Sequence, residues 1–455
     1  MSTGKQSAVD KMRAAGVSPT AISIFEYYWD QLASGATGLI PEDTIDPLTD
    51  PDRLNDTPET AADREALAAT AIIRLNGGLG TSMGLSKAKT LLPVRDGMTF
   101  LDIIVKQVLW ARKAYDIQLP LIFLHSFSTR ADVLKALEAY PELAVGLLPL
   151  DMMQSEEPKL LRDDLTPVAW PKNPKLEWCP PGHGDLYPTM LDSGILDGLI
   201  AAGFRYASVS NSDNLGAAPS AKLAGWFAST GAPFATEITP RTPMDVKGGH
   251  IARRKADGRL ILRESAQTPK DEMRFFTDAA IHPYAHCNNL WFDLVALRDK
   301  LTETGGVLRL PLIRNSKTVD PTDATSPGVY QIESAMGAAI ESFEGARAIV
   351  VPRSRFLPVK KTNELALLRS DVFNLGVDFI PRATVDPLPV VDLGPAYTSI
   401  TGFEALMPEP LHLRDASTLT VTGDWTFGSD VTVIGDVRLD EPGGIITDGS
   451  VLRPE

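Results

Sequence analysis

The sequence has little cysteine and no long hydrophobic run. Its two cysteines, Cys179 and Cys287, lie far apart among 455 residues, which excludes a disulfide framework and argues against a structural zinc site. No run of about 18 apolar residues occurs, and the first residues, MSTGKQSAVDKMRAAG, lack the apolar core of a signal peptide. We therefore expect a cytoplasmic protein with no membrane partner.

Basic residues are also in deficit. The chain carries 44 Lys and Arg against 58 Asp and Glu, a formal net charge of −14, and no basic face stands out. This excludes nucleic acid as the main partner. Phosphate ligands are not excluded, because a few lysines and backbone amides in one cleft outweigh distant carboxylates. The length allows two or three domains.

The order of apolar segments predicts an α/β protein. Helical spacing over 8–34 indicates one or two helices, and 35–63, rich in Pro, Asp and Thr, predicts a loop. Short apolar runs then alternate with helical stretches, which is typical of a mostly parallel sheet flanked by helices. In such sheets ligands bind at the carboxyl ends of the strands. The expected strands are 71–75, 119–125, 206–214, 234–239, 288–294 and 346–351.

The last part of the chain has a different pattern. In residues 419–439, LTVTGDWTFGSDVTVIGDVRL, short β-branched runs are broken by Gly-Asp or Gly-Ser turns, a pattern that predicts stacked short strands. We expect three parts: an N-terminal helical segment and loop (1–64), a catalytic domain (65–375) and a C-terminal β domain (376–455). A tail of this kind either mediates homo-oligomer formation or packs on its own catalytic domain.

A glycine-rich segment follows the first strand. The string LNGGLGTSMG (75–84) removes side chains from a strand-to-helix turn, so backbone amides can approach a polyphosphate or a base. Its spacing fits neither the dinucleotide fingerprint nor the P-loop. A flexible surface turn is the alternative. Lys89 lies directly before an apolar run and is favoured as a phosphate ligand, whereas Lys87 is better explained as a solvated side chain.

Two further strings point to ligand chemistry. In PPGHGD (180–185), glycines flank His183 on both sides, which favours a binding role over a structural one. In SNSDN (210–214), Asp213 lies at a strand end among amides, a setting that suits Mg²⁺. An Asx-rich turn explains SNSDN equally well. DVKGG (245–249) also fits a plain hairpin turn, NNLW (288–291) offers two amides for sugar hydroxyls, and Lys360 adds a second basic site.

These strings together resemble the eukaryotic-type UTP–glucose-1-phosphate uridylyltransferase family. The resemblance rests on LNGGLGTSMG with Lys89, EWCPPGHGDLYP, SNSDNLGA, DVKGG, NNLW and RFLPVKKTNEL, in the family's order from about residue 70 to 375. It implies a glycosyltransferase-A-like, Rossmann-like domain. The stretch LTVTGDWTFG resembles that family's C-terminal left-handed β-helix. The implied substrates are UTP and glucose 1-phosphate, and the implied cofactor is Mg²⁺.

The resemblance also implies roles for individual residues. UTP would be bound by backbone groups of the glycine loop, by Gln154 in the string MQS, and by Gly182. Lys89 and Lys360 would neutralise phosphates, and Asp213 would coordinate Mg²⁺. The loop positions are Leu75, Asn76, Gly77, Gly78 and Gly80, and the positions expected at the sugar phosphate are His183, Asn211, Gly249, Glu264 and Asn289.

Departures from the family pattern are few. Cys179 stands where an aromatic residue is common, and Lys87-Ala88 replaces a common Gly-Pro. Related UDP-N-acetylhexosamine pyrophosphorylases carry an arginine where this chain has Ser82. Two alternatives stay open: an enzyme acting on N-acetylhexosamine 1-phosphate or on several sugars, and a catalytically silent nucleotide-sugar sensor or assembly protein.

Overall fold

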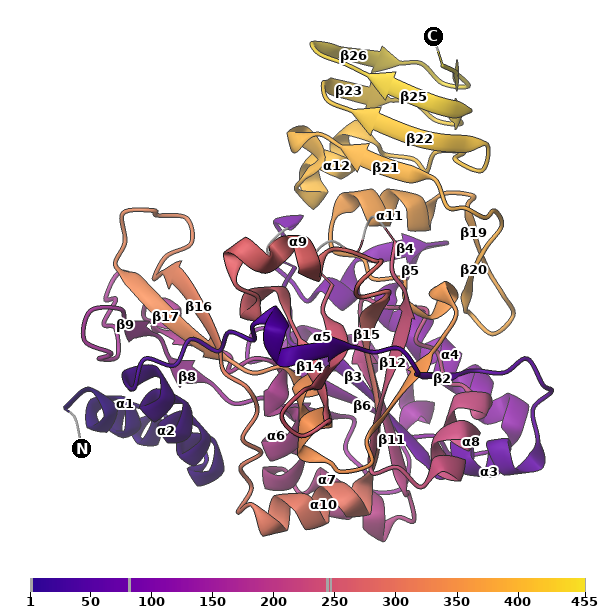
Figure 1. The fold of residues 1–455 in the computed structure, drawn as a ribbon. Helices are drawn as coiled ribbons and strands as arrows, with labels where there is room; N and C mark the ends of the chain where they lie inside the picture. Colours follow the sequence, from indigo (N-terminus) through magenta and orange to yellow (C-terminus); the bar gives the residue numbers. More distant parts are fainter. Residues whose placement is uncertain (1–2, 81–82, 243–244, 246–247, 455) are drawn as a thin grey trace.

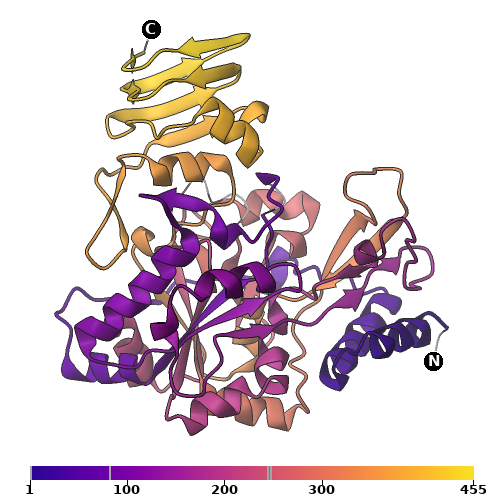
Figure 2. The same ribbon diagram turned by 180° about the vertical axis from the view of Figure 1, so that it is seen from behind.

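The computed structural model describes residues 3–80, 83–242, 245 and 248–454. Ser82 of the glycine loop and residues 246–247 of DVKGG lie outside this range. A central body of sheet and helices carries a helical hairpin on one side and a stack of short strands above it (Figures 1 and 2). Over the described residues, no helix is both long and apolar enough to span a bilayer.

An eight-stranded sheet forms the centre of the body. Every neighbouring pair of strands is parallel except the two pairs made by β15, so the expectation of a mostly parallel sheet is confirmed. In spatial order the strands are β2 (Asp52–Arg53), β18 (Arg347–Val350), β12 (Phe234–Pro240), β15 (Tyr284–Asp293), β11 (Tyr206–Asn211), β3 (Thr70–Asn76), β6 (Leu121–His125) and β7 (Asp151–Met153).

The sheet separates two hydrophobic cores, which explains why its strands read as continuous apolar runs. In β3, Ile72 belongs to one core and Ile73 to the other. The first core is covered by α3 (Ala61–Ala68), α4 (Phe100–Tyr115) and α8 (Ala221–Thr230), and the second by α6 (Leu186–Asp192), α7 (Ile195–Ala201) and α10 (Leu294–Glu303).

The N-terminal segment forms two helices, α1 (Thr3–Ala14) and α2 (Pro19–Ala33), within the expected one or two. The hydroxyl of Ser18 caps α2, and Pro19 occupies its first position, where no backbone N–H is needed. The pair packs on a small sheet of β16 (Ile313–Thr318), β17 (Gly328–Glu333) and β9 (Leu160–Leu161).

The predicted loop over 35–63 contains more structure than expected. Strand β1 (Ile45–Pro47) pairs with β13 (His250–Arg254), β2 forms one edge of the main sheet, and α3 begins at Ala61 after a capping box of Thr60 and Asp63. Strands of two or three residues show no periodicity in the sequence, because an alternating pattern is recognisable only over about four or more residues.

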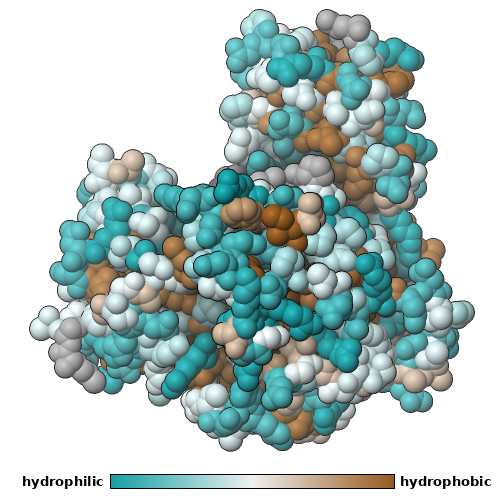
Figure 3. All heavy atoms as spheres, viewed as in Figure 1, coloured by the Kyte–Doolittle hydropathy of each residue, from teal (hydrophilic) through white to brown (hydrophobic). Residues whose placement is uncertain are grey.

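The C-terminal unit consists of stacked parallel strands with α12 (Ile400–Leu406) at its base, and α11 (Thr362–Arg369) lies between this unit and the body. It rises from the body as a separate block (Figure 3), yet one hydrophobic core continues from the body into it. The parallel sets are β21 (Val390–Leu393), β22 (Ala416–Val421) and β25 (Gly435–Leu439), then β23 (Asp424–Phe427) with β26 (Gly443–Ile446), and β24 (Thr432–Val433) with β27 (Val451–Leu452).

Shorter elements connect these parts. They are α5 (Arg130–Leu137), α9 (Met273–Phe276), β4 (Pro93–Arg95), β5 (Met98–Thr99), β8 (Glu157–Pro158), β10 (Trp178–Cys179), β14 (Leu260–Arg263), β19 (Phe373–Leu375) and β20 (Pro381–Ala383).

Candidate active site

Four neighbouring parallel strands bring their carboxyl ends to one edge of the main sheet. The register pairs Asn211 at the end of β11 with Leu75 of β3, Asn76 with His125 of β6, and His125 with Met153 of β7. The segments that follow these strands therefore lie side by side, although they are far apart in the sequence. They contain the glycine loop, Gln154 and the SNSDN string.

A cavity of about 310 Å³ opens at this edge. Eleven of the fifteen site residues expected from the sequence line it: Leu75, Asn76, Gly77, Gly78, Lys89, Gln154, Gly182, His183, Asn211, Asp213 and Lys360. Its wall also contains four residues outside that set: Thr90, Leu124, Pro180 and Ser212. Pro180 and Ser212 belong to strings already noted in the sequence, whereas the apolar Leu124 gave no signal of its own.

The backbone of the glycine loop accepts hydrogen bonds from two side chains that follow β6. The hydroxyls of Ser126 and Thr129 donate to the carbonyls of Gly77 (2.8 Å) and Asn76 (2.7 Å). A Cβ atom at Gly77 would lie 3.0 Å from Oε1 of Gln154, so the absence of a side chain lets the loop approach that amide closely.

Gly80 has a different place from the rest of the loop and does not line the cavity. With φ at +68° it closes the turn, and its carbonyl accepts from the N–H groups of Met83 and Leu85. Gly80 is therefore not part of the cavity wall, and its contact with UTP stays a prediction. Its role is to turn the chain toward Lys89.

Asp213 holds the two lysines together. Its Oδ2 atom accepts from Nζ of Lys89 at 2.8 Å and from Nζ of Lys360 at 3.3 Å. Burial alone would raise the pKa of Asp213, but the two lysines lower it below its ordinary value. Lys89 also donates to the carbonyl of Val359 and is 14 % exposed, whereas Lys360 is 60 % exposed. Lys89 is thus held by two acceptors, whereas Lys360 is held through Asp213.

Two unpartnered oxygen atoms at the Asp213 end of the cavity suit a divalent cation. Oδ1 of Asp213 and the hydroxyl of the neighbouring Ser212 are both buried without a hydrogen-bond partner, and both residues line the cavity. Among the described residues, no group of three or more His, Cys, Asp or Glu side chains could hold a metal ion. One carboxylate is what Mg²⁺ uses when phosphates and water supply its other ligands.

His183 presents a neutral imidazole to the cavity. Its Nδ1 atom accepts from the backbone N–H of Met336 at 2.9 Å, which places the proton of the neutral ring on Nε2. Burial, and to a smaller degree the charge of Lys360, lowers the pKa of His183 to about 4. Gly182 turns the chain into this position with φ at +79°, where a Cβ would lie 2.6 Å from the carbonyl oxygen of Ser334.

Gly249 and Glu264 lie together outside the cavity wall. A Cβ on Gly249 would be 2.7 Å from Oε2 of Glu264, so the glycine leaves room for that carboxyl group. Burial raises the pKa of Glu264 to about 7, and the charge of Lys360 opposes this shift.

Asn289 does not line the cavity, because its side chain points into the protein. Asn289 is 1 % exposed, its Nδ2 donates to Glu237, and its Oδ1 accepts from Asn214. The adjacent Asn288 is the one whose Nδ2 donates to Oδ1 of the cavity residue Asn211, at 3.0 Å. Oδ1 of Asn288 is buried without a partner, and its backbone is left-handed at φ +55°.

Comparison with known proteins identifies the family. The model of the UTP–glucose-1-phosphate uridylyltransferase family matches residues 24–434. The chain belongs to this family. A relative of that name from Saccharomyces cerevisiae is 38% identical over 85% of this chain and 78% of its own length, and one from Solanum tuberosum is 36% identical over 91% and 84%.

Solved structures of the uridylyltransferase family agree with the whole fold. A UDP-glucose pyrophosphorylase from Leishmania major, solved as a mutant with UDP-glucose, has a TM-score of 0.93 and 40% sequence identity, and the match covers 100% of this chain and 99% of that one. A UDP-glucose phosphorylase from Trypanosoma brucei has a TM-score of 0.90 and 38% identity, with 100% coverage of both chains. The mixed α/β architecture with its large, mostly parallel sheet is thus that of the family.

Proposed function

We propose that this enzyme transfers the uridylyl group of UTP to glucose 1-phosphate, giving UDP-glucose and pyrophosphate. The observation that carries the proposal is the meeting of Lys89, Lys360 and Asp213 at the carboxyl edge of the sheet, beside the glycine loop. The family match and the relatives named for this reaction support the choice of substrates.

The reaction needs no covalent enzyme intermediate. A phosphate oxygen of glucose 1-phosphate attacks the α-phosphorus of UTP in line, the bond to the β-phosphate oxygen breaks, and pyrophosphate leaves with the bonding electrons. No proton has to move. The work of the protein is alignment and neutralisation of the charge that develops on the phosphates.

Each part of the site has a place in this scheme. The glycine loop and Gln154 bind the uridine, because a backbone without side chains can pack against a flat base. Lys89 and Lys360 neutralise the phosphates, and the Nε2–H group of His183 donates a hydrogen bond to the bound substrates. Asp213 would hold Mg²⁺, which would supply charge stabilisation at the phosphate oxygens.

The hexose is proposed to lie beside Asn211 and Asn288. These two amides are already hydrogen-bonded to each other, and the unpartnered Oδ1 of Asn288 leaves an acceptor for a sugar hydroxyl. Gly249 and Glu264, which lie together, are proposed to complete this side.

The domain division is proposed along the same boundaries as expected: 1–64, 65–375 and 376–455. We propose a glycosyltransferase-A-like catalytic domain and a left-handed β-helix for the C-terminal part. The parallel pairing of β21, β22 and β25 supports stacked coils. Assembly through this unit and a cytoplasmic location stay predictions.

A substrate panel tests the function. Purified enzyme with Mg²⁺ and UTP is given glucose 1-phosphate, galactose 1-phosphate or N-acetylglucosamine 1-phosphate, and pyrophosphate release is measured. We expect the highest kcat/KM with glucose 1-phosphate. A preference for the N-acetylated sugar would assign the chain to that chemistry. UTP binding without pyrophosphate release from any sugar would identify a silent sensor and refute the proposal.

A further inference from the structure

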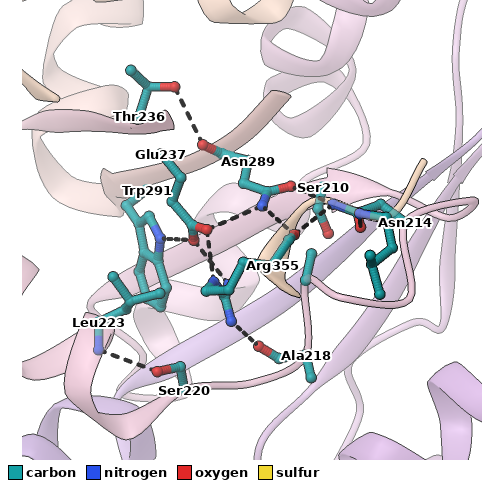
Figure 4. Close-up of polar contacts among 12 residues, drawn as sticks. Ser210, Asn214, Ala218, Ser220, Leu223, Thr236, Glu237, Asn289, Trp291 and Arg355 are labelled. Atoms are coloured by element: carbon teal, nitrogen blue, oxygen red, sulfur yellow. Dashed lines mark hydrogen bonds and ion pairs between the residues drawn. The ribbon is translucent and has the colours of Figure 1, made fainter. Parts of the chain in front are cut away.

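A buried polar network joins residues of β12 and β15 to Asn214 and Arg355 (Figure 4). Its centre is the carboxylate of Glu237 in β12, which is 0 % exposed. Glu237 accepts from Nε and one terminal nitrogen of Arg355 (2.7 and 2.9 Å), from Nδ2 of Asn289 (3.0 Å) and from Nε1 of Trp291 (2.9 Å). A buried charge with this many donors is fully compensated and held in one place.

The network extends to the segment that leads into Lys360. Asn214, 1 % exposed, donates from Nδ2 to the carbonyl of Arg355 at 3.0 Å and to Oδ1 of Asn289 at 3.2 Å. Its Oδ1 accepts from the N–H of Leu357 at 2.9 Å. The amide of Asn214 therefore uses both its donors and its acceptor inside the protein.

Asn214 links two chain segments that both enter the active site. It directly follows Asp213, and its partner Leu357 lies three residues before Lys360. An isolated β-bridge between Asn214 and Pro358 joins the same two segments through their backbones. Lys360 reaches Asp213 across this junction, at 3.3 Å.

From this arrangement we infer that Asn214 is a positioning residue. It sets the placement of Lys360 relative to Asp213. Asn214 donates directly to the carbonyl of Arg355, and Glu237 holds Asn214 in place through Asn289. The inference rests on the proposed function and deepens it, since none of these four residues lines the cavity. Their effect on catalysis passes through Lys360.

A double-mutant cycle tests this inference. Asn214→Ala should lower kcat about 10- to 100-fold while KM for UTP and for glucose 1-phosphate changes less than about threefold, because the nucleotide and sugar contacts stay. In a Lys360→Ala background the same substitution should cost less than about threefold, because the lysine it positions is already gone. Equal factors in both backgrounds would overturn the inference.

Gln107 provides a matched control for lost stability. It is a buried amide whose Nε2 donates to two backbone carbonyls, those of Leu215 and Phe379, and it has no hydrogen bond to the 355–360 segment. Gln107→Ala should lower the melting temperature as much as Asn214→Ala but leave kcat within about threefold. An equal loss of kcat in both variants would show a general effect of destabilisation and refute the positioning role.

A second variant covers the case in which Asn214→Ala does not fold. Asn289→Ala should lower kcat about 5- to 10-fold without raising KM for glucose 1-phosphate, since Asn289 acts one step further from Lys360. A rise in that KM of more than about tenfold with kcat unchanged would make Asn289 a direct sugar contact and overturn the network assignment.

Chemical labelling separates this inference from the proposed reaction. Lys360 should react faster with an amine-specific acylating reagent in Asn214→Ala than in the wild type, whereas Lys361 should react equally in both, as read by mass spectrometry. Unchanged labelling of Lys360 would refute the inference even in an active enzyme. A wild type without transferase activity would refute the proposed function alone.

Discussion

Replacing Lys89 by Met removes a charge that the structure fixes in place. Lys89 is held by Asp213 and by the carbonyl of Val359, and it is 14 % exposed. In such surroundings the effective dielectric constant is about 20, and two unit charges about 4 Å apart interact by about 4 kcal/mol. Losing most of this interaction with the reacting phosphates corresponds to a fall in kcat/KM of about 10²–10³.

The fold should tolerate the Lys89→Met change. Asp213 keeps Lys360 at 3.3 Å, so its buried carboxylate retains one partner. The methionine side chain fills the space of the lysine stem. We expect the free energy of unfolding to fall by no more than about 2 kcal/mol. Pyrophosphate release measures the fall in kcat/KM, and urea denaturation measures the change in the free energy of unfolding.

Lys87→Met is the matched control, because Lys87 lies two residues away on the same segment, is exposed and does not line the cavity. Both variants change the net charge equally. Lys87→Met should keep kcat/KM within about threefold. A Lys89→Met enzyme within about tenfold of the wild type, or equal losses in both variants, would refute the role assigned to Lys89.

Three further predictions follow from the site. Asp213→Asn should lower kcat at least about 10²-fold and raise the Mg²⁺ concentration needed for half-maximal rate; an unaltered Mg²⁺ titration would contradict its role as a metal ligand. Burial raises the pKa of Glu264 from an ordinary 4.5 to about 7, so the folded state favours the protonated form and this carboxyl costs the wild type stability as pH rises from about 4.5 to 7. The melting temperature of Glu264→Gln should therefore rise relative to the wild type across that window and stay level above it, and parallel curves would exclude the shift. Asn288→Ala should raise KM for glucose 1-phosphate about tenfold and leave KM for UTP within about threefold, whereas an equal change in both would place Asn288 away from the hexose.

The main sheet and the glycine loop could be predicted from local sequence. A strand buried on both faces reads as a continuous apolar run, so the six expected strands all correspond to strands of the sheet. The glycine loop was visible because several glycines directly follow the first of them. Lys89 could be placed because an apolar segment follows it and holds it near the interior.

Asn288 and Asn289 illustrate what local pattern leaves undecided. Adjacent residues of a strand point to opposite faces, and register decides which face is the cavity. Here the pairing of β12 with β15 shifts register between Thr236 and Ile238, and Asn288 adopts φ of +55°. Neither feature leaves a mark in the sequence, in which NNLW simply offers two adjacent amides.

The sequence by itself determined which chemical groups this protein has and that they follow strands, because glycine content, apolar runs and turn residues act over a few neighbouring positions. Only the tertiary structure decided that Lys89 and Lys360 share one oxygen of Asp213. It also decided that β2 completes the sheet edge and that Asn214 joins the two segments behind the cavity. These contacts join residues distant in the chain, and their geometry depends on strand order and packing, which no local pattern encodes.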